Sequence, residues 1–314
     1  MSEPAARPSV GIAERVLANL ATAVRAPEEV LRLPLLCLLA EGHALIEDVP
    51  GVGKTMLAKA LARSFDLGFA RVQFTPDLLP SDVTGVSVYD QRSGSFAFRP
   101  GPVFTNVLLV DEINRASPRT QSALLEAMQE TQVTVDGESH LLQRPFLVLA
   151  TQNPLEFEGT YPLPEAQLDR FAIRMSVGYP SFADEARLLA SETTEPALDR
   201  LQPVAGADEV LAAIVQARAV FVEESVNRYV VALLRNTRES GHLALGASPR
   251  AGIALLRLAK ALAFVLGRDY VTPEDIQAMA VPALAHRVLP AAGNRDAGAV
   301  KAIEEAVSHT PAPV

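Results

Sequence analysis

The spacing of apolar residues changes character part-way along the chain. Up to about residue 179, short apolar runs that suit buried strands alternate with longer segments of helical periodicity. The predicted strands are 44–47, 71–74, 107–110 and 146–150, and the helices between them include 56–64 and 118–130. Strands that alternate with helices predict an α/β fold, in which a parallel sheet carries helices on both faces.

Beyond residue 179 the pattern predicts helices alone, at 183–191, 208–222, 224–239, 249–266 and 273–285. The stretch 193–207 is rich in Pro, Ala and Gly, which favours a linker, and the polar tail from residue 291 looks loose. The predicted division is an α/β core over 1–180, a linker region over 181–207, an all-α lid over 208–290 and a loose tail over 291–314. Segment 12–40 is also predicted to be helical, with a buried helix at 31–40.

Two segments of the core read as β-hairpins. Segment 81–104 alternates on either side of Arg92-Ser93-Gly94, and segment 131–142 alternates around Asp136-Gly137. Asp-Gly is a preferred dipeptide for a two-residue hairpin turn. We therefore expect a hairpin insert at each place.

Composition narrows the classes of protein. The 314 residues are 49% apolar, and 37 acidic against 28 basic residues give a net charge of −9, which argues against nucleic acid as a partner. One cysteine, Cys37, excludes a disulfide framework and a thiol metal site. The first ten residues lack the pattern of a secretory signal, and 31–40 is too short to cross a bilayer. These features predict a cytoplasmic protein without membrane insertion.

A glycine loop lies between a predicted strand and a predicted helix. It consists of Pro50, Gly51, Val52, Gly53, Lys54, Thr55 and Met56. In such a loop the backbone N–H groups and the helix dipole bind phosphates, the lysine reaches the β- and γ-phosphates, and the hydroxyl ligates Mg²⁺. The strict pattern has glycine at the position that Asp48 occupies in this chain. Asp is a residue type that tolerates left-handed turns. The loop predicts ATP and Mg²⁺ as ligands, bound chiefly by Lys54 and Thr55.

Polar residues also follow two other predicted strands. Asp111 and Glu112 come after the 107–110 run, where we assign Asp111 to the Mg²⁺ shell and Glu112 to activating the attacking water. Asn153 follows the 146–150 run and is placed to hydrogen-bond the γ-phosphate or that water. Each has a plainer alternative: a solvated acidic loop for the pair, and an ordinary Asn-Pro turn for Asn153.

At this point the motifs resemble a known family. They are Glu47-Asp48-Val49-Pro50-Gly51-Val52-Gly53-Lys54-Thr55, Asp111-Glu112-Ile113-Asn114-Arg115-Ala116, Ala150-Thr151-Gln152-Asn153-Pro154 and Pro164-Glu165-Ala166-Gln167-Leu168-Asp169-Arg170-Phe171. Together they resemble the MoxR AAA+ ATPases over about residues 12–289. The resemblance implies a P-loop AAA+ core with an all-α lid, and it makes Asp48 an ordinary member of the motif. The hairpin at 81–104 would be the helix-2 insert, and the one at 131–142 the hairpin before sensor 1.

The resemblance also implies further roles. Asn153 would be sensor 1, and Arg170 an arginine finger that reaches a neighbour's nucleotide, with Arg115 and Arg174 as weaker finger candidates. The alternative for Arg170 is a surface salt bridge to Asp169 or Glu165.

Arg250 stands in the first turn of a predicted helix, after Ser248 and Pro249. A cation is unfavourable at that end of the helix dipole, so an anion should compensate it. By the resemblance Arg250 would be sensor 2 and contact nucleotide phosphates. The sequence leaves open whether it acts in its own subunit or across an interface, and an unpaired surface arginine is the alternative.

By the same resemblance, the protein would be an ATPase that works as a homo-oligomeric ring of six subunits and remodels or matures a partner protein or a metal-dependent complex. A von Willebrand factor A domain protein would be its partner. The alternatives are the motor subunit of a metal chelatase-like complex and a DNA motor; against the latter, the hairpin at 131–142 carries acids and no Lys or Arg. A small-molecule P-loop kinase is a further alternative, and such an enzyme would need no neighbouring subunit for its activity.

Overall fold

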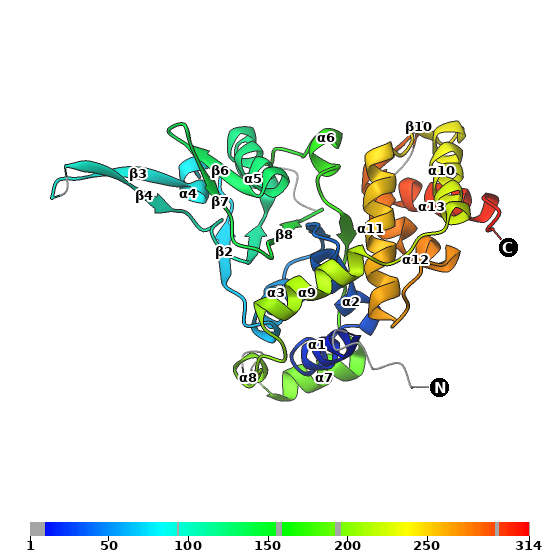
Figure 1. The fold of residues 1–314 in the computed structure, drawn as a ribbon, viewed down its shortest axis with the longest axis horizontal. Helices are drawn as coiled ribbons and strands as arrows, with labels where there is room; N and C mark the ends of the chain where they lie inside the picture. Colours follow the sequence, from blue (N-terminus) through cyan, green and yellow to red (C-terminus); the bar gives the residue numbers. More distant parts are fainter. Residues whose placement is uncertain (1–9, 93, 155–158, 192–195, 293–294, 314) are drawn as a thin grey trace.

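A computed structural model describes residues 10–92, 94–154, 159–191, 196–292 and 295–313. Its centre is a five-stranded parallel sheet in the order β2-β5-β8-β1-β9 (Figure 1). The strands are β1 (Ala44–Glu47), β2 (Phe69–Gln73), β5 (Val107–Asp111), β8 (Leu147–Gln152) and β9 (Ile173–Met175). The expected parallel sheet is thus confirmed. Strand β9 was not predicted, because three residues with Arg174 in the middle carry no recognisable alternation.

Helices cover both faces of this sheet, as expected. Successive side chains of a strand point to opposite faces, so Leu109 and Leu149 pack with one set of helices while Leu108 and Val148 pack with another. The first set is α1 (Val10–Ala23), α2 (Glu28–Leu39) and α3 (Lys54–Ser64), and α5 (Pro118–Glu130) covers the other face. All four leucine and valine side chains named here are fully buried.

Both predicted hairpins are present. Strands β3 (Gly85–Asp90) and β4 (Ser95–Pro100) form one, after the short helix α4 (Pro80–Thr84), and extend away from the sheet (Figure 1). Strands β6 (Gln132–Val135) and β7 (Glu138–Leu141) form the other, with Asp136 and Gly137 both at positive φ in the turn. The two hairpins meet where His140 stacks on Phe98, with ring centroids 3.9 Å apart.

The second half of the chain is helical. Its helices are α7 (Phe182–Ser191), α8 (Pro196–Asp199), α9 (Ala207–Arg218), α10 (Glu224–Glu239), α11 (Pro249–Val265), α12 (Pro273–Leu284) and α13 (Arg295–His309), and the 3₁₀ turn η2 (Ala285–Arg287) follows α12. A small sheet of β10 (Leu243–Leu245) and β11 (Leu289–Pro290) lies among them. Helix α11 packs against α12, α9 and α2, so the core of the lid is continuous with that of the α/β part.

The prediction of a loose tail was wrong. Helix α13 occupies most of that segment and buries Ala299, Ala302, Ile303 and Ala306 against the rest of the lid. Three of these four residues are alanines, so the apolar stripe at helical spacing is weak in the sequence. Asp296 at its start also forms an ion pair with Arg174 of β9, 2.5 Å between Nη1 and Oδ1.

Two other segments differ from expectation. The described part of the predicted linker packs into the core, where Leu198 and Leu201 are buried; residues 192–195 lie outside the described ranges. The helical segment 12–40 is broken into α1 and α2, because Pro27 fixes an extended backbone at the start of α2. As predicted, residues 31–39 are buried, apart from a few partly exposed positions.

None of the helices described is long and apolar enough to cross a membrane.

Candidate nucleotide site and arginine edge

The predicted glycine loop joins the end of β1 to the start of α3. Gly51 and Gly53 have φ of +86° and +94°, a region that side-chain-bearing residues rarely adopt. Nothing stands within 4 Å of where a Cβ would lie at either glycine, so the space over the loop is open. Helix α3 begins at Lys54, and its first N–H groups therefore face this space. Such a cradle fits phosphate oxygens.

Lys54 connects the loop to the acids of β5. Its Nζ donates to the carbonyl oxygen of Asp48 at 2.8 Å. Burial lowers the pKa of Lys54, and the nearby carboxylates of Asp48, Asp111 and Glu112 oppose that shift. The loop and the two acids therefore converge on one edge of the sheet, which we call the nucleotide edge.

Asp111 and Glu112 are held in place by neighbouring side chains. The largely buried carboxylate of Asp111 accepts from Thr151 Oγ1 at 3.3 Å and pairs with Arg71 Nε at 2.6 Å. Glu112 has a φ of +56°, and its N–H donates to the same Thr151 hydroxyl at 3.0 Å. Its Oε2 accepts from Gln73 Nε2 at 2.8 Å and pairs with Arg115 Nε at 2.7 Å. No pattern in the sequence singles out Arg71 or Gln73.

Asn153 also lies at the nucleotide edge. It follows β8, which pairs with β1 on one side and β5 on the other, so it stands between the glycine loop and the acids of β5. The residue is 8% exposed. Its position is therefore the one that the strand-end argument predicts.

Asp48, which stands where the strict loop pattern has glycine, anchors the glycine loop. Its buried Oδ2 accepts from Ser176 Oγ at 3.0 Å, from Val177 N at 2.7 Å and from Gly178 N at 2.8 Å. A glycine could not make these contacts. Asp48 thus ties the start of the loop to the segment that leaves β9.

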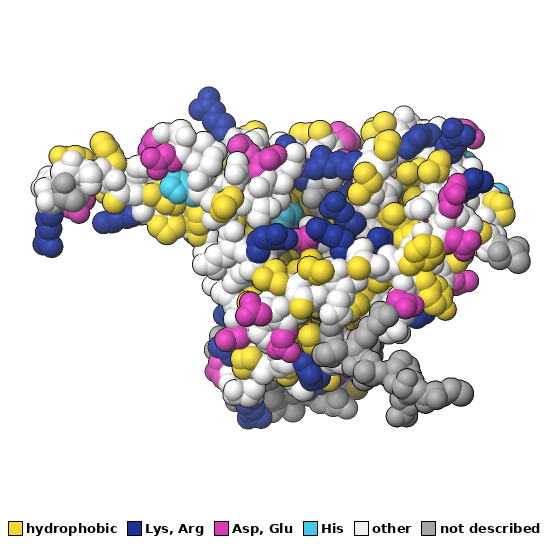
Figure 2. All heavy atoms as spheres, viewed as in Figure 1, with side chains coloured by type: hydrophobic (Ala, Val, Ile, Leu, Met, Phe, Trp, Pro, Cys, Tyr) yellow, Lys and Arg dark blue, Asp and Glu magenta, His cyan; other side chains and the backbone are white. Residues whose placement is uncertain are grey.

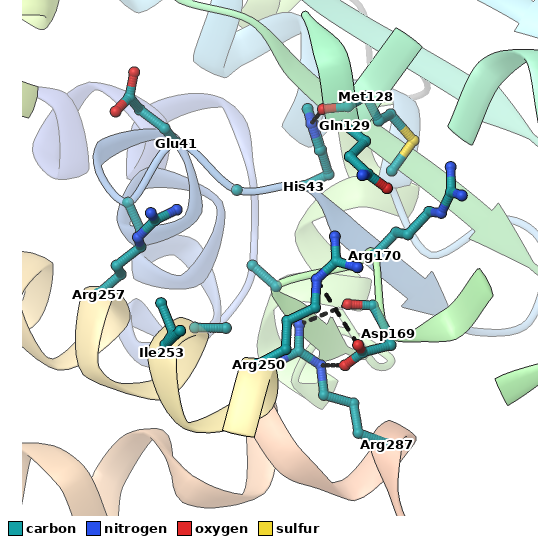
Figure 3. Close-up of a pocket in the computed structure, with 14 residues that line it drawn as sticks. Glu41, His43, Met128, Gln129, Asp169, Arg170, Arg250, Ile253, Arg257 and Arg287 are labelled. Carbon is teal, nitrogen blue, oxygen red and sulfur yellow. Dashed lines mark hydrogen bonds and ion pairs between the residues drawn. The ribbon is translucent and has the colours of Figure 1, made fainter. Parts of the chain in front are cut away.

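Arg170 and Arg250 lie away from this edge. Arg170 precedes β9, which runs parallel to β1 with Ala44 opposite Ile173, so it stands beside the start of β1 rather than its end. Arg250 is in the first turn of α11 and lines the same pocket as Arg170, together with Arg257, Arg287 and His43 (Figure 3). Figure 2 shows Lys and Arg side chains gathered where the core meets the lid. We call the end of the sheet that borders this pocket the arginine edge.

The two edges are separated by the length of β1. Five residues from His43 to Glu47 span about 15 Å in an extended strand. Among the predicted site residues, the structure thus brings Lys54, Asp111, Glu112 and Asn153 together and keeps Arg170 and Arg250 apart from them.

Ion pairs distinguish the arginine candidates. Arg174 pairs with Glu47 and Asp296 and is 14% exposed, and Arg115 pairs with Glu112 of its own subunit.

The described part of the chain gives Arg170 no ion-pair partner; the Asp169 carboxylate is instead 3.8 Å from Arg250 Nε and 3.3 Å from Arg287 Nε. Asp169 is therefore the anion that compensates Arg250. The sequence did not single out Arg287, whose only local signal is a charge inside the apolar stretch after α12.

Comparisons with known proteins agree with this architecture. Residues 43–173 match the model of the ATPase family associated with various cellular activities (AAA), and residues 235–306 match the AAA lid domain. The chaperone MoxR1 of Mycobacterium tuberculosis is 40% identical over 307 residues, which are 92% of this chain and 81% of that protein.

The chain belongs to the MoxR family of AAA ATPases. YeaC of Bacillus subtilis, an uncharacterised protein, is 51% identical over 82% of this chain and 80% of its own length. A crystal structure of a Cytophaga hutchinsonii protein classed as an ATPase superimposes with a TM-score of 0.86 at 39% identity, covering 96% of this chain and 95% of that one. This MoxR-family protein is therefore an ATPase with an AAA core and a helical lid.

Substitution of Asp48 tests its anchoring role. In Asp48→Ala the Ser176 hydroxyl and two backbone N–H groups lose their acceptor, and we expect the free energy of unfolding to fall by about 2–4 kcal/mol. The loop should also bind a fluorescent ATP analogue at least about tenfold more weakly, which is ~1.4 kcal/mol. Asp48→Asn keeps one acceptor oxygen and should show smaller changes in both measurements. Unchanged affinity in Asp48→Ala would show that the carboxylate does not shape the loop.

Proposed function

We propose that this MoxR-family ATPase hydrolyses ATP at the interface between two copies of the chain. The observation that carries the proposal is the separation of the two edges, because Arg170 and Arg250 stand about 15 Å from the glycine loop of their own subunit. A head-to-tail neighbour would bring its arginine edge to this nucleotide edge. Repetition of such a heterologous contact closes into a ring, for which we propose six subunits.

At the nucleotide edge, the first N–H groups of α3 and the Lys54 ammonium would bind the phosphates. Thr55 and Asp111 offer the oxygen ligands that Mg²⁺ prefers. When bound, Mg²⁺ would neutralise negative charge on the phosphates.

Glu112 would activate the attacking water. Its hydrogen bond from Gln73 and its ion pair with Arg115 hold the carboxylate at a defined place beside the loop. Asn153, which lies between the glycine loop and Glu112, would orient the γ-phosphate or the water. Both roles require the strand ends to stay in register, as the parallel pairing of β8 with β1 and β5 ensures.

From the neighbour, Arg170 would stabilise the charge that develops on the transferred phosphoryl group. Such a finger accelerates hydrolysis by about 10³–10⁵, or ~4–7 kcal/mol of transition-state stabilisation. Arg250, aimed into the same pocket, would contact phosphate oxygens beside it. Hydrolysis would thus require assembly.

We propose that the cycle serves a chaperone-like remodelling of a protein client, a role that the name of MoxR1 supports. A von Willebrand factor A domain protein would be the partner that recruits the client, and the cytoplasm the site of action. A DNA client fits poorly, because Glu138 and Asp136 are the charged residues of the β6–β7 hairpin.

Mixed assemblies test the shared site. Lys54→Ala should abolish nucleotide binding but leave its arginine edge intact, whereas Arg170→Ala should bind nucleotide and lack the finger. Each variant alone should be inactive. In a 1:1 mixture about a quarter of the interfaces join an intact loop to an intact finger, so we expect steady-state ATPase activity to return toward a quarter of the wild-type value. A mixture as inactive as its components would contradict hydrolysis across the interface.

A nucleotide-trapped assembly tests the remodelling role. Glu112→Gln should bind ATP and hydrolyse it at least about 10²-fold more slowly, since the activating carboxylate is lost. Affinity purification of this variant with ATP, followed by mass spectrometry, should retain a client and a von Willebrand factor A domain protein that Lys54→Ala does not retain. Recovery of chelatase subunits or of DNA would favour the corresponding motor instead.

A further inference from the structure

Two consecutive residues of the lid hold the core segment that contains Arg170. His286 and Arg287 belong to the 3₁₀ turn η2, and both are buried, at 3% and 7% exposure. They contact residues 169–171, which lie more than a hundred positions earlier in the chain. The contact therefore joins the lid to the core at the arginine edge.

Arg287 makes most of this contact. Its Nη2 donates to the carbonyl oxygen of Phe171 at 2.6 Å and to that of Asp169 at 3.1 Å, and its Nε is 3.3 Å from Asp169 Oδ1. Its Nη1 also lies 3.5 Å from the carbonyl oxygen of Ala251, the residue after Arg250. One planar guanidinium thus touches the backbone on both sides of Arg170 and the first turn of α11.

The charge state of the two residues suits this arrangement. Burial lowers the pKa of Arg287 to about 10, while Asp169 acts in the opposite direction, so the guanidinium stays charged at neutral pH. Burial lowers the pKa of His286 well below its usual value, so the ring is neutral and its Nε2–H donates to the Phe171 oxygen at 2.9 Å. A buried charge is a poor way to stabilise a fold, because hydrophobic residues of similar size often do as well. The contacts of Arg287 with the backbone on both sides of Arg170 therefore favour a role in geometry.

Asp169 extends the contact to Arg250. Its Oδ1 faces Arg287 and its Oδ2 faces Arg250, as the dashed lines in Figure 3 show. Arg170 is the next residue along the chain, so its backbone is fixed between the Asp169 and Phe171 carbonyl groups that Arg287 binds. A displacement of η2 would therefore move Arg170 and Arg250 together.

We infer that Arg287 is the positioning residue that aims Arg170 and Arg250 at the nucleotide of the neighbouring subunit, so that the lid of one subunit controls hydrolysis in the next. This inference rests on the proposed function, because it requires that the arginine edge acts across the interface. It assigns Arg287 no contact with the nucleotide itself.

Arg268 supplies a matched control. It is also a lid arginine, and it donates to the Asp275 carboxylate at 2.7 and 2.5 Å, with the Asp275 side chain 3% exposed. Its partners, the Asp275 carboxylate of α12 and the Tyr270 carbonyl oxygen in the loop before α12, lie within the lid, and Arg268 does not line the pocket of the arginine edge. Loss of Arg268 breaks an ion pair within the lid, whereas loss of Arg287 breaks an ion pair between the lid and the core and releases the Arg170 segment.

The experiment compares Arg287→Met with Arg268→Met, each alone and mixed 1:1 with Lys54→Ala. For Arg287→Met we expect kcat to fall about 100-fold, the effect of a misplacement of about 1 Å, with affinity for a fluorescent ATP analogue unchanged within about twofold. The Lys54→Ala subunits have an intact arginine edge, so the mixture should recover activity to the level of the Arg170→Ala mixture. Arg268→Met should keep its kcat within about threefold of wild type, as expected for a change distant from the transition state.

Each other outcome has a defined meaning. In one such outcome, activity recovers when Lys54→Ala is mixed with Arg170→Ala but not when it is mixed with Arg287→Met. That result would overturn the positioning role of Arg287 and leave the shared site standing. No recovery in either mixture would overturn the shared site itself. Equal losses of kcat in Arg287→Met and Arg268→Met would show a general effect of lid stability and overturn the inference. If Arg287→Met fails to assemble, Arg287→Lys replaces it. A single ammonium cannot reproduce the planar fork that also reaches the Asp169 carboxylate through Nε and the Ala251 carbonyl oxygen through Nη1, so kcat should still fall, and an unchanged kcat would overturn the inference.

Discussion

The parallel pairing of β1 with β9 is the constraint on which the rest of this ATPase depends. Because the two strands run in the same direction, the residues that follow β1 and the residues that precede β9 lie at opposite edges of the sheet. The glycine loop follows β1 and Arg170 precedes β9, so the loop and the proposed arginine finger lie about 15 Å apart in one subunit. Rotation of a side chain cannot close that distance. This separation supports the proposal that each edge supplies half of a site shared between two subunits.

The lid is fastened to this frame at the arginine edge. Arg287 and His286 bind the backbone around Arg170, and Asp296 of α13 pairs with Arg174 on β9. Asp48 fastens the other end of β9 to the start of the glycine loop through Val177 and Gly178. Strand β9 is therefore in contact with the nucleotide edge at one end and with the lid at the other. A short, packed route therefore joins the nucleotide edge of a subunit to the lid that holds Arg170 and Arg250 of the same subunit.

Local patterns in the sequence were enough to locate the nucleotide edge, because Lys54, Asp111 and Asn153 each follow a strand whose apolar run is visible. They did not show the arginine edge: Arg170 was singled out by family resemblance, and its separation from Lys54 depends on β9, a strand too short to recognise. Arg287 was missed because its main partners are backbone carbonyl groups 116 and 118 positions away, which leave no mark on the sequence. Helix α13 was missed because its buried stripe is mostly alanine, which helices also carry on exposed faces.

The most direct test of the shared site is a structure of the Glu112→Gln assembly with ATP and Mg²⁺, determined by electron cryomicroscopy. The account predicts that each γ-phosphate lies between Lys54 of one subunit and Arg170 of its neighbour, within hydrogen-bonding distance of both, and that Arg250 approaches from the same neighbour. A nucleotide contacted by Lys54, Arg170 and Arg250 of one and the same chain, or one that no arginine of a second chain reaches, would contradict it.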